Sequence, residues 1–138
     1  MKIRMLAAAA AGAVLVTGAG MACAKDVAVS LTGDQEVPAV QTEAKGAGKI
    51  TIADDKSVTG SIKTTGITGT AAHIHEAPAG QNGKPIITLE KKGDNEWVVP
   101  AGSKLTDAQY ESFKSGNLYV NIHSAEHKGG EIRTQLKP

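Results

Sequence analysis

Four histidines lie in two short segments, and their type and spacing suit the binding of a transition-metal ion. His73 and His75 stand two apart in AHIHEA, and side chains two apart on an extended strand project to the same side. An imidazole pair of this kind can chelate copper, zinc or nickel, while a histidine from a neighbouring strand completes the shell. The pattern therefore predicts a metal site formed by His73, His75 and His123. We expect His127 or Glu76 to supply a fourth ligand.

The site requires that the two histidine segments form neighbouring strands. Alternation along AHIHEA points Ile74 to the core, opposite to the two flanking histidines. The apolar row of NLYVNIHS consists of Leu118, Val120 and Ile122. Tyr119 and Asn121 then share the opposite face with His123, where they could orient imidazole rings by hydrogen bonds. All three site histidines are therefore expected on the outer face of a sheet.

The rest of the chain indicates an all-β domain with one short helix. Short runs rich in β-branched residues are separated by Gly, Pro, Asn and Asp, which is typical of a sandwich or barrel. The expected strands are 26–33, 48–55, 57–67, 72–77, 85–90, 96–100, 117–124 and 130–137. Thr106 and Gln109 have capping-box spacing, and Gly116 is a stop signal, so a helix is predicted from Asp107 to Lys114. No internal repeat or linker divides this domain.

The first 24 residues are predicted to be a signal peptide. Lys2 and Arg4 precede an apolar run, and Ala-Cys-Ala at 22–24 fits the rule for cleavage after Ala24. We therefore expect a periplasmic or secreted protein whose mature chain is a single domain, residues 25–138.

A lipid anchor on Cys23 is the less favoured alternative. Gly20 stands where lipoprotein signals usually carry an aliphatic residue. Cys23 is the only cysteine and would leave with the signal peptide, so the mature domain would have no disulfide. No second apolar run is long enough to span a bilayer.

Charge and motifs argue against several functional classes. Removal of the signal would reduce the basic residues from 15 to 13 against 14 acidic ones, which gives a formal net charge of −1. This charge does not indicate the excess of basic residues that nucleic-acid-binding domains have. The sequence has no nucleophile elbow or phosphate loop. Ser124 is adjacent to His123 and therefore too close in sequence for a catalytic triad. Glu36 and Asp34 are expected to be ordinary turn residues.

Three stretches of the sequence resemble the CHRD domain, a module named after the animal protein chordin and also found singly in exported bacterial proteins. The matching stretches are LTGDQEVPAV, AAHIHEAPAGQNGKPIITL and LTDAQYESFKSGNLYVNIHSAEHKGGEIRTQL, within about Val27 to Leu136. The resemblance implies a Greek-key β-sandwich; bacterial members have no firmly established activity, and in animals the module is a binding part of a larger secreted antagonist. Glu126-His127-Lys128 stands where relatives often have Asn-Pro, so the resemblance does not support His127.

The histidine motifs are also similar to those of copper,zinc superoxide dismutase, another exported Greek-key protein. Its HVHE copper motif is similar to His73-Ile74-His75-Glu76, and its later VVH strand to Asn121-Ile122-His123. This similarity implies copper ligands at His73, His75 and His123. The chain lacks counterparts of the zinc loop and of the arginine that guides superoxide, so we favour a binding role over catalysis.

Copper, as Cu(I) or Cu(II), is the expected ion, with zinc as the alternative. Three imidazoles without a thiolate suit either oxidation state, and copper stands above zinc in the order of divalent affinities. The expected role is sequestration or delivery, with a periplasmic donor or acceptor protein as partner; no oligomeric state is indicated. Two alternatives stay open. In one, the protein is an exported adhesion module that binds a protein or glycan, and its histidines are incidental surface residues; in the other, it is a superoxide dismutase-like enzyme.

Overall fold

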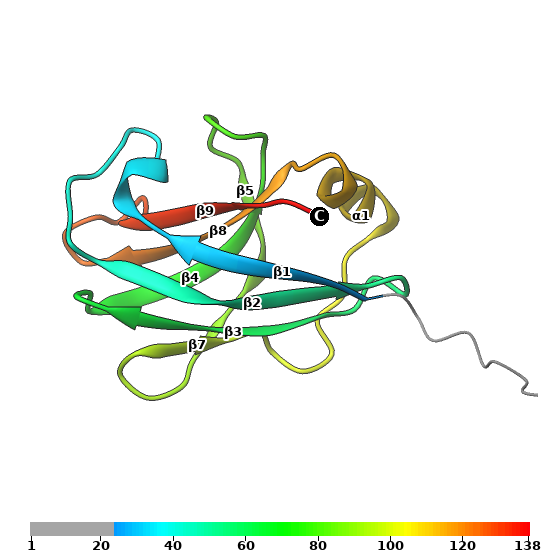
Figure 1. Cartoon of the computed structure of the whole chain (residues 1–138), viewed down its shortest axis with the longest axis horizontal. Helices are drawn as coiled ribbons and strands as arrows, with labels where there is room; N and C mark the ends of the chain where they lie inside the picture. The colour runs from blue at the N-terminus through cyan, green and yellow to red at the C-terminus, as the bar shows by residue number, and fades with distance from the viewer. Residues whose placement is uncertain (1–23) are drawn as a thin grey trace, which may run out of the picture.

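Two antiparallel sheets pack face to face in the computed structural model, which describes residues 24–138. The five-stranded sheet has the order β1 (Ala24–Leu31), β2 (Lys45–Ala53), β3 (Val58–Thr65), β7 (Glu96–Val98), β6 (Glu90–Lys91). The four-stranded sheet has the order β5 (Lys84–Thr88), β4 (Gly69–Glu76), β8 (Leu118–Ser124), β9 (Ile132–Leu136). Figure 1 shows the two layers, with the helix α1 (Asp107–Lys114) at one end. The predicted all-β sandwich is confirmed.

The predicted signal peptide lies outside the described residues except for its last residue. Ala24 begins β1 and is paired with Ala53 of β2. Cys23, the candidate for lipidation, also lies outside the described part of the chain.

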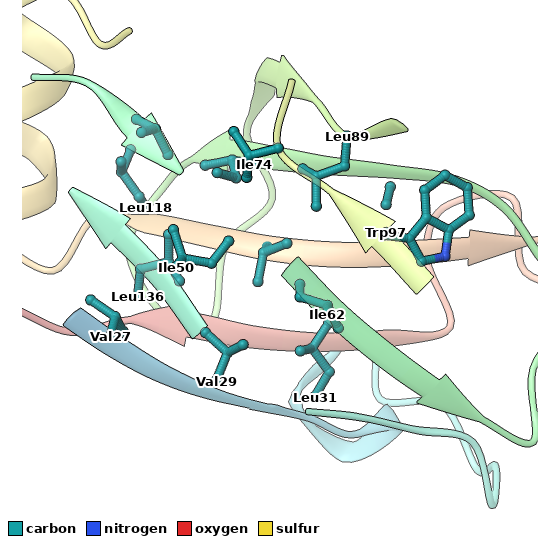
Figure 2. Packing of buried hydrophobic residues seen from close by; sticks show 14 of the residues in the cluster. Val27, Val29, Leu31, Ile50, Ile62, Ile74, Leu89, Trp97, Leu118 and Leu136 are labelled. Atoms are coloured by element: carbon teal, nitrogen blue, oxygen red, sulfur yellow. The ribbon is translucent and has the colours of Figure 1, made fainter. Parts of the chain in front are cut away.

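The core lies between the sheets and is built by the inward residues of each strand. Val27, Val29 and Leu31 alternate along β1 with exposed neighbours, as the period of two predicts. Trp97 of β7 packs into the same cluster at one end of the sandwich (Figure 2). Ile74 of β4 is fully buried in the core, which agrees with its predicted inward orientation.

The two sheets approach each other at both edges. On one side, β1 lies near β9 (Figure 1), and Thr32 and Arg133 exchange backbone hydrogen bonds of 3.2 and 3.0 Å. On the other side, the chain passes from β5 to β6 through the single residue Leu89, whose amide donates to Ala72 O. The prediction of one strand over 85–90 was therefore wrong, because Leu89 turns its side chain into the core where the chain changes sheets.

The helix has the predicted bounds and the predicted cap. The Thr106 side chain accepts a hydrogen bond from the Gln109 amide, and the Gln109 side chain accepts one from the Thr106 amide. Phe113 buries one face of α1 in the core. The turn after α1 leads directly into β8, so the helix sets the start of the strand that carries His123.

Candidate metal centre

The strand register brings three predicted site histidines together. In the antiparallel pair β4–β8, His73 lies opposite Asn121, His75 opposite Tyr119 and Ala71 opposite His123. Alternation places all these side chains on the outer face of the four-stranded sheet, away from the core. The histidine pair of β4 and the histidine of β8 therefore meet as the sequence pattern required.

One ring nitrogen from each of His73, His75 and His123 lies within 4.8 Å of the other two. His73 Nδ1 and His123 Nε2 are 3.1 Å apart. Two nitrogens bound tetrahedrally at about 2.0–2.1 Å from one zinc ion stand roughly 3.3 Å from each other. The spacing of these two rings is thus close to what a shared ion requires.

Backbone carbonyl groups select the ring nitrogen that two of the histidines present. His123 Nδ1 donates to Lys128 O at 2.8 Å, and His75 Nδ1 donates to Gly83 O at 3.0 Å. A neutral imidazole with its proton on Nδ1 has its lone pair on Nε2. His75 Nε2 is buried and has no hydrogen-bond partner among the described residues. Histidines that bind metals are commonly oriented in this way by a hydrogen bond from the second ring nitrogen.

Electrostatics keep the imidazoles of β4 in the neutral form that binds metals. Burial, together with the neighbouring imidazoles of His123 and His75, lowers the pKa of His73 below its usual value. Burial also lowers the pKa of His75, against the hydrogen bond to Gly83 O, which raises it. Both rings therefore have their lone pairs available at neutral pH.

Loops cover the outer face around the histidines, so this face is less exposed than the strand pattern indicated. His75 is only 7% exposed, and Tyr119 and Asn121 are each 2% exposed. The loop after β4 supplies Gly83, whose amide donates to Tyr119 Oη at 3.1 Å. The description of all three histidines as incidental surface residues does not fit the burial of His75.

The other two proposed ligands do not join this cluster. Glu76 lies 4.0 Å from Lys84 in a partly exposed ion pair. His127 lies on the loop after β8 and forms a separate group with Glu126 and Glu131, whose ligand atoms also lie within 4.8 Å of one another.

A buried polar group beside the histidines was not expected from the sequence. Arg133 of β9 is 1% exposed and has its guanidinium 3.5 Å from the ring centroid of Tyr119, which itself stacks on His75. Glu36, expected to be an ordinary turn residue, is 5% exposed, and burial raises its pKa to about 7 against the opposing effect of Arg133. Pairing of Arg133 with Asn121 across β8–β9 is the feature that could have revealed this group, but it depends on the strand order.

Comparison with protein families shows that residues 27–136 match the CHRD domain. The chain belongs to the CHRD family. The matched range includes both histidine segments and all nine strands apart from the first residues of β1. Comparisons with curated proteins and with solved structures give no match. Within residues 24–138 of this CHRD domain, no helix has the length and apolar character needed to cross a membrane.

Proposed function

We propose that this CHRD domain is an exported protein that binds one transition-metal ion, copper in preference to zinc, through His73, His75 and His123. The observation that carries the proposal is the convergence of three imidazole nitrogens within 4.8 Å, in which backbone carbonyls fix the rings of His75 and His123. The histidines come from two segments about fifty residues apart, so the site exists only in the folded domain.

The donor set supports copper first. Three nitrogen ligands without a thiolate or carboxylate suit copper in either oxidation state, and the divalent affinity order places copper above zinc. The proposed role is to hold the ion in the periplasm and pass it to, or receive it from, another exported protein. A site with a buried, preoriented ligand such as His75 would retain its ion, whereas the partly exposed rings of His73 and His123 would be the place of exchange.

Metal titration of the purified protein tests this proposal. Cu(I), Cu(II) and Zn(II) are titrated separately into the parent and into the single variants His73→Gln, His75→Gln and His123→Gln, with chromophoric chelators as competitors. We expect one-to-one binding in the parent and at least a tenfold loss of affinity in each variant, as outright ligand removal should cost no less than the 10–100-fold typical of outer-shell changes.

His127→Gln is the matched control, because it removes a histidine outside the cluster. We expect the His127 variant to bind as the parent does. Weak binding in the parent, or an equal loss in the His127 variant, would contradict the proposal. The search would then turn to a protein or glycan partner of the CHRD domain.

A further inference from the structure

A stack of three side chains connects the buried arginine with the candidate metal centre. The guanidinium of Arg133 lies over one face of Tyr119, with its central carbon 3.5 Å from the ring centroid. The rings of Tyr119 and His75 are parallel, with an interplanar angle of 1° and centroids 4.7 Å apart. A positive charge is thus separated from a proposed ligand by one aromatic ring. Stacked aromatic rings and a cation over a ring face are favourable contacts in themselves.

The charge of Arg133 is buried and forms no close ion pair within residues 24–138, where the buried carboxyl of Glu36 acts on it only from a longer distance. Its hydrogen bonds go to neutral acceptors: Gln81 O at 2.8 Å, Asn82 Oδ1 at 3.2 Å and Gln135 Oε1 at 3.4 Å. An arginine in a protein stays charged, and a buried charge without a close ion-pair partner carries a large desolvation cost. Its field is therefore only weakly screened at His75, in contrast to that of a surface charge.

We propose that Arg133 determines the oxidation-state preference of the metal centre, because its buried positive charge beside His75 favours Cu(I) over divalent ions. The inference rests on the proposed metal-binding function. Cu(II) and Zn(II) each bring one unit of positive charge more than Cu(I) into the same field. At an effective dielectric constant of about 20, a unit charge about 10 Å away changes the ratio of affinities on the order of tenfold.

Arg133 also has a structural role that the test must separate from its charge. Through Gln81 and Asn82 it holds the loop whose next residue, Gly83, accepts the hydrogen bond from His75. Loss of that support would loosen His75 and weaken the binding of every ion by a similar factor. Loss of the charge would change the ratio between Cu(I) and the divalent ions.

The experiment measures the affinities for Cu(I), Cu(II) and Zn(II) in the parent and in three variants. Arg133→Gln removes the charge, and Arg133→Lys keeps the charge but replaces the planar guanidinium with an ammonium group. Asn82→Ala removes one acceptor of Arg133 on an exposed loop residue and changes no charge. Zn(II) serves as the internal control, because it has the charge of Cu(II) and no redox chemistry.

We expect Arg133→Gln to reduce the preference for Cu(I) over both divalent ions about tenfold. Arg133→Lys should retain most of that preference, and Asn82→Ala should lower all three affinities alike. If Arg133→Gln changed the affinities for all three ions by the same factor, the inference would be overturned. The proposed metal site itself would not be contradicted. Failure of the parent to bind any of the ions would instead overturn the proposed function.

A second variant covers the case in which Arg133→Gln does not fold. Glu36 is buried near Arg133 and Asn121, and its carboxylate opposes the field of Arg133 when ionised. Glu36→Gln is of nearly the same shape. At about pH 8.5, above the pKa of Glu36, this change should raise the preference for Cu(I) severalfold. An unchanged preference would show that buried charges on this side of the site do not set it, and would contradict the inference.

Discussion

At the scale of single residues, the proton positions on three imidazoles would decide how the proposed site accepts an ion. The carbonyl groups of Lys128 and Gly83 hold the protons of His123 and His75 on Nδ1, so both rings present Nε2. The hydrogen bond between His73 and His123 then has its proton on His73 Nδ1. An incoming ion would replace that proton, which moves to the other nitrogen of the His73 ring.

Glu36 is the residue whose burial should be visible in the pH dependence of stability. Burial raises its pKa from 4.5 to about 7, so the folded protein binds this proton more tightly than the unfolded chain does. The contribution to stability is complete below about pH 4.5 and is lost as the pH rises through about 7. A shift of this size corresponds to roughly 3 kcal/mol.

Urea unfolding of the parent and of Glu36→Gln across this pH range measures the effect. The difference between the two free energies of unfolding isolates Glu36 from the other titrating groups. We expect the parent to lose roughly 3 kcal/mol relative to the variant between about pH 4.5 and pH 7.5. A difference that is constant with pH would show that Glu36 has an ordinary pKa in the folded protein.

At the scale of elements, the loop between β8 and β9 supports the site through its backbone. Lys128 O and Gly129 O accept hydrogen bonds from His123 and Asn121, and Gly130 packs against Asn121. Gly130 has a φ of +121°, and a Cβ there would lie 2.4 Å from Asn121 Nδ2 and 2.6 Å from Glu36 Oε1. Only glycine fits this position without displacement of the groups beside His75.

Neighbouring glycines of this loop provide a matched pair of variants. Gly130→Ala should destabilise the fold by about 1–3 kcal/mol and weaken metal binding, because it strains the backbone and displaces Asn121. Gly129→Ala meets no atom within 4 Å and should leave metal affinity near that of the parent. Thermal unfolding and metal titration of both variants check this. Equal behaviour of the pair would mean that the contacts of Gly130 do not matter.

The N-cap of α1 allows a test of stability in an element that is not part of the proposed metal centre. Thr106 accepts a hydrogen bond from the Gln109 amide within a reciprocal capping box. Thr106→Ala should cost about 1 kcal/mol of unfolding free energy in denaturant titrations. Thr106→Ser keeps the hydroxyl and should recover most of that loss; no recovery would assign the loss to the methyl group instead of the cap.

Local patterns predicted most elements because each strand or helix is specified by its own residues. The helix bounds followed from Thr106 and Gly116, and the shared face of His73 and His75 followed from the pleat. The break at Leu89 and the burial of Glu36 depend on tertiary packing, which produces no periodic pattern of residues in the sequence. Arg133 was missed for the same reason, since its role depends on pairing with β8.

At the scale of the whole molecule, the proposed metal centre lies outside the core and still depends on the complete sandwich. The proposed ligands come from β4 and β8, the central strands of the four-stranded sheet. Groups that orient the ligands come from the loops after β4 and β8, and Arg133 comes from β9, which also bridges to the chain beyond β1. Binding of an ion at the proposed site would therefore stabilise the folded chain as a unit.

Thermal unfolding with and without metal tests this coupling. An ion that binds only the folded protein adds about 2.7 kcal/mol when its free concentration is one hundred times the dissociation constant. For a domain of this size, that corresponds to a rise in Tm of roughly 10 °C. We expect the rise in the parent and in His127→Gln, and little rise in His75→Gln, which loses the most deeply buried ligand. A similar rise in His75→Gln would show that the ion acts elsewhere on the protein, because the unfolding transition reports only the sites that the folded state holds more tightly than the unfolded chain does.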